Sequence, residues 1–339
     1  MTLAAQVAGF LAARARWRPL EIAFWVAAAA SIFLLPGRHL MLTEIAILGL
    51  FALSLDLVLG YAGILSLGHA AFFGLGAYTA GLLAKDALIA EPVLALAAAG
   101  LVAAALGFAT SFLLLRGSDL TRLMVTLGVA LILREIANRF DWLTGGADGL
   151  QGIVIGPVLG VFAFDITGHV AYVYSLAVLF VLFLIARRLV HSPFGLSLRA
   201  LKGNRLRAAA IGISVDARLV AIYTFAAAYA GIAGALLTQT TQFASLDVLA
   251  FDRSADVLLV LILGGTGYLY GGLVGAIVFK LVQDALIGLT AQYWQFWIGL
   301  VLVLIVLGGD RMRNLPALLG EGLAGIGRRL AGRARAGTG

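Results

Sequence analysis

The sequence has 339 residues, of which 62% are hydrophobic and 12% are charged, and its mean hydropathy is +1.03. Average soluble domains are about half apolar and about a quarter charged, so a soluble globular fold is excluded. The absence of cysteine excludes disulfides, thiolate metal sites and cysteine nucleophiles. The net charge is +7, and its positive residues cluster between apolar runs, which is typical of membrane topology rather than nucleic-acid binding.

Apolar runs long enough to cross a bilayer follow one another along the chain. We expect spans at 20–35, 41–59, 66–84, 93–115, 120–138, 170–186, 219–240, 254–287 and 293–309. The first run lacks a small-residue cleavage site, so we interpret it as a retained span rather than a signal peptide. The sequence therefore predicts an all-α polytopic membrane protein with about eight to ten transmembrane helices.

Basic residues set the expected orientation, because cytoplasmic loops of membrane proteins are rich in lysine and arginine. Arginines precede the first span, so we expect residues 1–19 in the cytoplasm and a transmembrane domain over 20–309. The basic loop 187–218 and the basic tail 310–339 are expected on the same side. The mixed loop 139–169 is expected to be extracytoplasmic.

The stretch GYAGILSLGHAAFFGLGAYTAGLL, residues 60–83, is rich in glycine and contains one histidine. It is not a nucleotide loop, because the chain has no G-x-x-x-x-G-K-[ST] motif, and we infer that the chain does not hydrolyse ATP itself. Most of its glycines fit close helix packing. Two interpretations of His69 stay open: a neutral imidazole bonded to Ser66 or to a neighbouring carbonyl, or a group lining a pathway. Asp56 has no local partner and is expected to approach this segment.

The run 254–287 exceeds the roughly 20 residues that cross a bilayer, and GGTGYLYGG interrupts it. We expect a broken, re-entrant pair of segments that returns to the outer side and is covered by protein. Its pattern Gly264-x-x-Gly267-x-Leu269-x-x-Gly272 repeats the spacing of Gly60, Gly63, Leu65 and Gly68, by chance or as an internal repeat. Paired glycine-interrupted spans indicate a transport pathway. The candidate pathway residues are Asp56, Gly60, Gly63, Ser66, Gly68, His69, Gly264, Gly265, Gly267 and Gly272.

The loop 187–218 is strongly basic, with Asp216 as its one acidic residue. Ser192–Gly195 is predicted to form a turn, and 196–210 a short helix that ends at Gly212, a suitable C-cap. Charge bias near acidic lipid head groups explains the arginines. The helix and its terminal glycine also fit a segment that docks a cytoplasmic partner.

Four ordered motifs carry a family resemblance: the stretch at 60–83, TGGADGLQGI at 144–153, FGLSLRALKGNRLRAAAIGI at 194–213 and LILGGTGYLYGGLVGA at 261–276. Together they resemble LivM-type permease subunits of branched-chain amino acid ABC importers. The resemblance implies a non-enzymatic, multi-pass subunit of the bacterial inner membrane that transports a branched-chain or other small amino acid, or an amide.

The resemblance also implies partners: a homologous permease subunit, two cytoplasmic ATPase subunits that use the ATP, an extracytoplasmic binding protein, and membrane lipid. No cofactor, metal or nucleic acid is expected on this chain. The residues implied to contact an ATPase are Arg199, Lys202, Asn204, Arg205, Ala208 and Gly212. Family members commonly carry an acidic residue where this chain has Arg205, and often another at Gly203, so coupling here would require a complementary acidic groove on the ATPase.

A transporter of a different class is the alternative. A stand-alone secondary transporter would couple ions through Asp56, His69 or the pair Lys280 and Asp284, which lie four residues apart and can share one helix face. A membrane-embedded enzyme is disfavoured, because no acid, base or metal constellation is clustered in the sequence.

Overall fold

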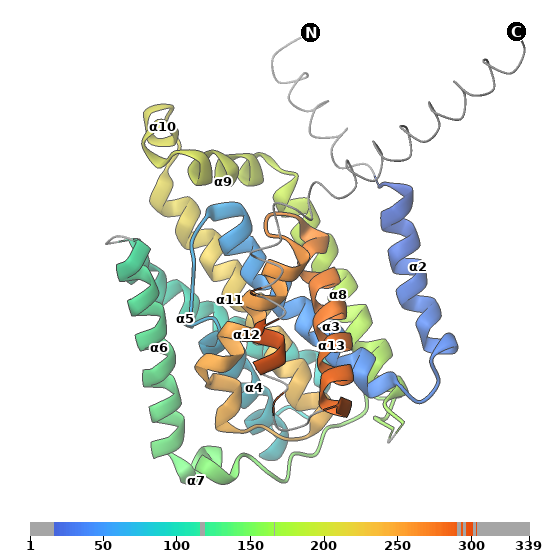
Figure 1. Ribbon diagram of the computed structural model, residues 1–339. Helices are drawn as coiled ribbons and strands as arrows, with labels where there is room; N and C mark the ends of the chain where they lie inside the picture. Colours follow the sequence, from blue (N-terminus) through green and yellow to red (C-terminus); the bar gives the residue numbers. More distant parts are fainter. Residues whose placement is uncertain are drawn as a thin grey trace, which may run out of the picture. The chain divides into compact units, whose positions relative to one another are not determined.

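Helices account for all the regular elements in the part of the chain that the computed structural model describes, residues 17–115, 119–165, 167–289, 293, 296–300 and 303. The chain divides into two compact units, 1–280 and 281–339. The helix contacts that surround the candidate site lie within the first unit. The α-helices, drawn in Figure 1, are α2 (Pro19–Leu34), α3 (His39–Asp56), α4 (Ala70–Lys85), α5 (Pro92–Leu115), α6 (Asp119–Arg139), α7 (Asp141–Thr144), α8 (His169–Val190), α9 (Pro193–Gly203), α10 (Arg205–Ala210), α11 (Val215–Thr241), α12 (Phe251–Gly264) and α13 (Leu269–Leu289). Shorter turns are the π turn η1 (Leu57–Tyr61) and the 3-10 turns η2 (Gly146–Asp148) and η3 (Leu246–Leu249).

The prediction of an all-α polytopic membrane protein is confirmed. Among the described residues, five helices are long and apolar enough to span a bilayer: His39–Tyr61, Pro92–Leu113, His169–Val190, Val215–Thr241 and Leu269–Gly288. Helices α2, α4 and α12 are shorter, and α6 carries charged residues along its length. The expected total of eight to ten stays a prediction, because most of the predicted span 293–309 and the tail 310–339 lie outside the described residues.

Small residues hold the centre of the helix packing. Helix α11 lies against α3, α4 and α5. Gly76 of α4 meets the backbone of Gly231 on α11 so closely that a Cβ atom there would overlap it, and a Cβ on Gly231 would overlap Ala103 of α5. Contacts of this kind let membrane helices gain dispersion energy by close approach. The glycines of 60–83 that lie within α4 therefore serve packing, as the sequence suggested.

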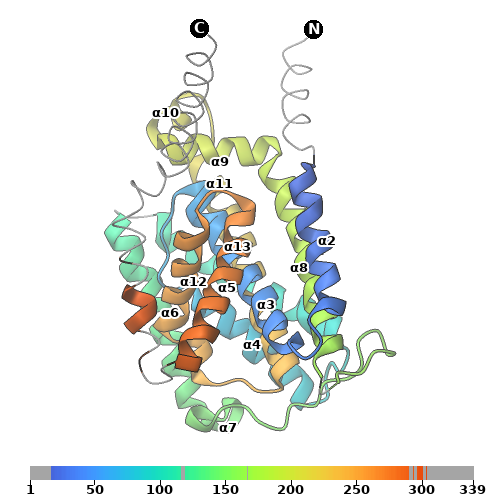
Figure 2. The ribbon, with the colours of Figure 1, turned by 45° about the vertical axis from the view of Figure 1, so that its right-hand side comes forward.

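Two spans are broken. The predicted span 66–84 becomes helical only at Ala70, and the preceding span extends to Tyr61 through η1. Residues 63–69 between them are irregular, and Ile64, Ser66, Gly68 and His69 among them are buried. In the second half the predicted interruption is present: α12 ends at Gly264 and α13 begins at Leu269. Figures 1 and 2 show α12 and α13 running side by side, and a Cβ on Gly275 of α13 would overlap the Val260 carbonyl of α12.

Cross-contacts satisfy the backbone of these breaks. The amide of Leu67 donates to the Thr126 hydroxyl at 3.2 Å, and the amide of Ala70, the first residue of α4, donates to the Ser254 hydroxyl of α12 at 2.9 Å. Irregular backbone at membrane depth requires such internal partners, because lipid offers none.

The two ends of the helical body differ. Helices α9 and α10 lie at one end, together with the start of α2, and α7 lies at the other (Figure 1). Near α7 the glycine-rich segment 144–153 folds back into the body, where Leu150 is buried and donates its amide to the Ala244 carbonyl at 2.7 Å. This loop thus fixes the chain that leads from α11 into α12.

Candidate functional site

Segments from three parts of the chain meet at a cluster that we call the glycine junction, consisting of Asp56, Gly60, Gly267 and Lys202. The Asp56 carboxylate accepts a hydrogen bond from the Gly267 amide at 2.7 Å. The Lys202 ammonium donates to the Gly60 carbonyl oxygen at 2.7 Å. The junction therefore joins α3, the α12–α13 loop and α9 through two bonds between residues far apart in sequence.

Glycine is required at both backbone positions of the junction. A Cβ on Gly60 would overlap the Asp56 carboxylate and the Gly267 amide nitrogen. Gly267 has φ of +78°, a left-handed conformation that side chains other than glycine disfavour. Gly63, at the equivalent position of the first glycine pattern, has φ of +70°. The two patterns thus share a local conformation as well as a spacing.

Charge compensation explains how Asp56 is tolerated. Its side chain is fully buried, and Oδ2 has no hydrogen bond among the described residues. A buried charge is costly unless an opposite charge lies near it. The Lys202 ammonium, bonded to Gly60 on the same turn, supplies that charge, so a helix predicted to dock a partner completes a buried polar site.

Further contacts seat α9 on η1. The Arg199 guanidinium lies over the Tyr61 ring at 5.4 Å, and a Cβ on Gly63 would lie 3.1 Å from the Lys202 Cγ. The sequence predicted two separate groups: a pathway group with Asp56, Gly60, Gly63 and Gly267, and a partner-docking group with Arg199 and Lys202. The structure places all six residues together.

Ser66, Gly68 and His69 lie in a second, closely packed cluster. The His69 Nε2 lies 2.8 Å from the Ser54 hydroxyl, so the expected bond to Ser66 or to a carbonyl was wrong. Its ring is fully buried and stacks on Phe51 with centroids 5.7 Å apart. A Cβ on Gly68 would overlap the Thr126 carbonyl. This packing favours the structural interpretation of His69.

The remaining pathway candidates shape the α12–α13 hairpin. Gly264 packs on the Gly271 backbone, and Gly265, with φ of +92°, ends α12. Gly272 packs against Ala52 of α3, where an added Cβ would lie 3.0 Å from the alanine methyl. Gly264 and Gly272 thus permit close backbone and helix contacts, whereas a Cβ on Gly265 would meet no atom within 4 Å.

The coupling segment differs from its prediction. Instead of one helix over 196–210, the chain forms α9 and α10 with a break at Asn204, whose side chain caps α10 by accepting the Arg207 amide at 3.0 Å. Ser192 caps α9 and Pro193 occupies its first turn, so the predicted turn at Ser192–Gly195 is the start of a helix.

The other coupling residues lie on or after α10. Gly212 ends α10 with φ of +85° as predicted, and Ala208 is buried. Burial, and then the nearby Arg122 guanidinium, lower the pKa of Arg205. The carboxylate of Asp119, which forms an ion pair with Arg122, acts in the opposite direction on the pKa of Arg205.

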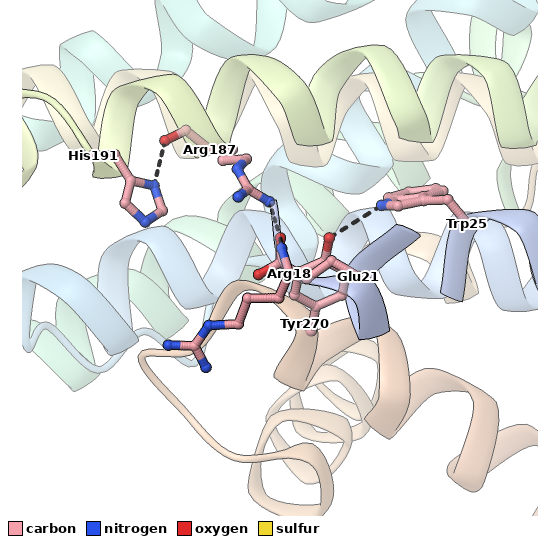
Figure 3. Close-up of polar contacts among 6 residues, drawn as sticks. All are labelled: Arg18, Glu21, Trp25, Arg187, His191 and Tyr270. Atoms are coloured by element: carbon pink, nitrogen blue, oxygen red, sulfur yellow. Dashed lines mark hydrogen bonds and ion pairs between the residues drawn. The ribbon is translucent and has the colours of Figure 1, made fainter. Parts of the chain in front are cut away.

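A second polar cluster escaped the sequence analysis. Glu21 of α2 forms an ion pair with Arg187 of α8, whose guanidinium also lies 4.1 Å from the centre of the Trp17 ring. Trp25 of α2 donates its indole N–H to the Tyr270 hydroxyl at 3.2 Å (Figure 3). The sequence did mark both residues, because Glu21 is a lone acid in an apolar run and Arg187 is the first residue of the basic loop. Their separation of 166 residues, however, gives no indication that they form a pair.

Lys280 also has a partner that spacing does not reveal. Its ammonium forms an ion pair with Glu44 of α3 at 2.6 Å. The sequence had suggested Asp284, four residues later on the same helix.

A family model described as "Branched-chain amino acid transport system / permease component" matches residues 39–306. Similar curated proteins include the "High-affinity branched-chain amino acid transport system permease protein LivM" of Escherichia coli K12, 29% identical, and that of Salmonella typhimurium LT2, 28% identical. Each alignment covers 76% of this chain and 65% of the relative. The "Probable ABC transporter permease protein YphD" of E. coli K12 is 31% identical over 38% of this chain and 41% of that protein. No solved structure matches the chain significantly.

Proposed function

Because this chain belongs to the family of permease components of branched-chain amino acid transport systems, we propose that it is the membrane-spanning subunit of an ATP-driven importer. Its substrate is a branched-chain or other small amino acid, or an amide. The chain is a multi-pass protein of the bacterial inner membrane. It spans 65% of the length of the LivM relatives that it matches.

The proposed assembly contains a homologous permease subunit, two cytoplasmic ATPase subunits and an extracytoplasmic binding protein. ATP is bound and hydrolysed on the ATPase subunits, and this chain needs no cofactor. Arg199, Lys202, Asn204, Arg205, Ala208 and Gly212 form the ATPase-coupling segment, with an acidic groove on the ATPase facing Arg205. The basic surface of α9 and α10 supports this arrangement.

The bond between Lys202 and Gly60 carries the proposal further. An ATPase that moves α9 also moves η1, and the Asp56–Gly267 bond passes that displacement to the α12–α13 loop. Both glycine-interrupted segments then shift together. We propose that this shift alternates access to a route beside them.

Stand-alone ion coupling is not favoured. Two of its candidates, Asp56 and His69, are fully buried and held by hydrogen bonds to Gly267 and Ser54. Lys280 pairs with Glu44. An ion-coupling group must exchange its ion with water during each cycle, and full burial denies Asp56 and His69 that access in this conformation.

Reconstitution tests the proposal. The chain is co-expressed with candidate permease, ATPase and binding-protein subunits, and uptake of radiolabelled leucine and other small amino acids is measured in proteoliposomes. We expect uptake that requires both ATP and the binding protein. The matched control replaces ATP by a non-hydrolysable analogue and should abolish uptake. Ion-driven uptake by the chain alone, without ATP, would contradict the assignment.

A further inference from the structure

A polar cavity of about 570 Å3 lies beside the glycine junction, at the end of the body that carries α9. Its wall is formed by the start of α2, by the residue that follows α8, by helix α9 and by the start of α13. The side chains that matter for its chemistry are Trp17, Arg18, Glu21, His191, Arg199 and Tyr268.

The charge of this cavity is positive. Glu21 is the one acid in its wall, and it is neutralised by the ion pair with Arg187 behind it. Arg18 and Arg199 face the cavity, and neither forms an ion pair with a residue in the described part of the chain. Figure 3 shows the Arg18 guanidinium pointing away from the Glu21–Arg187 pair. Two guanidinium groups are thus available to an anion.

A helix start adds to this positive charge. Helix α13 begins at Leu269 on the cavity wall, where the partial positive charge of a helix start favours an anion. Arginine forks and helix starts are the groups that bind phosphate in proteins.

The surface next to the cavity is apolar. On α2, directly after the cavity-lining turn, Ile22 and Val26 are 52% and 61% exposed. Trp17, at the rim, is 40% exposed, and tryptophan is typical of the depth at which lipid head groups meet hydrocarbon. A soluble anion would not contact this apolar surface, whereas the acyl chains of a lipid would pack against it.

We propose that this cavity binds the phosphate head group of an anionic phospholipid from the cytoplasmic leaflet. Arg18 and Arg199 hold the phosphodiester, the positive end of α13 attracts it, and the acyl chains lie along the exposed face of α2. Because Arg199 also rests on Tyr61, the bound lipid contacts the same helix that carries Lys202. The inference concerns lipid recognition and does not depend on the transported substrate.

Thermal unfolding of the full-length protein in a neutral detergent tests this site. Intrinsic tryptophan fluorescence reports the unfolding midpoint during separate titrations with dioleoyl phosphatidylglycerol and dioleoyl phosphatidylcholine. A ligand that binds only the folded state raises the midpoint with its concentration. We expect a rise with phosphatidylglycerol and little change with phosphatidylcholine.

Charge-removing variants give the residue-level test. Arg18→Gln should bind phosphatidylglycerol about fivefold more weakly, because one basic group near a membrane surface contributes about that factor. Arg207→Gln, which removes the same charge from the exposed surface of α10, should bind as the unmodified protein does. Equal midpoints for both variants without lipid confirm that each is folded.

Four outcomes overturn the proposal. An equal rise of the unfolding midpoint with the two lipids would show that the cavity does not recognise the head group. An equal loss of phosphatidylglycerol affinity in Arg18→Gln and Arg207→Gln would show the same. A full response to sodium glycerol phosphate alone assigns the cavity to a soluble phosphate. Loss of the co-purifying ATPase in Arg18→Gln with an unchanged phosphatidylglycerol response assigns it to a protein partner.

Discussion

The Lys202 ammonium on α9 lies 2.7 Å from the carbonyl oxygen of Gly60, which ties a helix at one end of the body to the first glycine-interrupted segment. Through Asp56 the same contact reaches Gly267 in the second segment. In the importer proposed above, these two hydrogen bonds would carry the displacement from α9 to both glycine-interrupted segments, and each can be removed separately.

Replacing Lys202 by methionine keeps the length of the side chain and removes its donor. Hydrogen bonds to charged groups contribute about 1.5–3 kcal/mol, so we expect coupled transport to fall by about 10- to 100-fold. The measurement is amino acid uptake per ATP hydrolysed by the reconstituted complex. Lys202→Arg keeps a charged donor and should retain most of the coupling. Equal uptake in Lys202→Met and the unmodified protein would count against the coupling role.

Replacing Asp56 separates its hydrogen bond from its charge. Asp56→Asn keeps an acceptor for the Gly267 amide, whereas Asp56→Ala leaves that amide without its carboxylate partner. An unsatisfied buried donor costs about 1–3 kcal/mol, so the alanine variant should lose that much stability relative to the asparagine variant. Denaturant unfolding of the detergent-purified protein measures both. Indistinguishable stabilities would show that the Asp56–Gly267 bond does not hold the hairpin.

Gly60→Ala adds one methyl group at the centre of the glycine junction. That methyl would overlap the Asp56 carboxylate and the Gly267 amide, so the two segments must separate. Overpacking of a tight contact typically costs about 1–3 kcal/mol. Gly128→Ala on α6 is the matched control, because an added Cβ there meets no atom within 4 Å. We expect a lower unfolding midpoint and lower uptake for Gly60→Ala, and neither loss for the control.

His69→Ala tests whether the buried histidine supports structure or lines a route. The imidazole packs on Phe51 and bonds Ser54, so its removal leaves a cavity and costs an expected 2–5 kcal/mol, the range of large-to-small core substitutions. Membrane insertion and unfolding midpoint should fall together with transport. Normal stability with abolished transport would instead support the pathway role.

Composition and apolar run length were enough to predict the membrane class and the order of the helices, because lipid solvation imposes both. The break after Gly264 was predictable for a related reason: the run was too long for one crossing, and glycines interrupted it. The irregular segment 63–69 was not predictable, because its small and apolar residues are also typical of a transmembrane helix. Contacts that spacing does not reveal, such as those of Leu67 with Thr126, His69 with Ser54 and Ala70 with Ser254, stabilise it in another conformation.

The site was predicted in its parts but not in its assembly. Sequence spacing reveals neighbours three or four positions apart on a helix, and this led to Asp284 as the partner of Lys280. The contacts of Lys202 with Gly60 and of Glu44 with Lys280 join helices far apart in the chain, so only the packing of α3, α9 and α13 defines them. The break at Asn204 had a local signal, the Gly203-Asn204 pair, which also favours a helix stop.

The buried start of α4 has a consequence for ion tightness. Ala70 lies fully inside the body and directs its amide to Ser254, so the positive end of the α4 dipole faces the interior rather than water. A cation approaching this depth meets an electrostatic barrier of the kind that excludes protons from water channels. In the ATP-driven importer proposed above, such a barrier would let uptake proceed without draining the proton gradient across the same membrane.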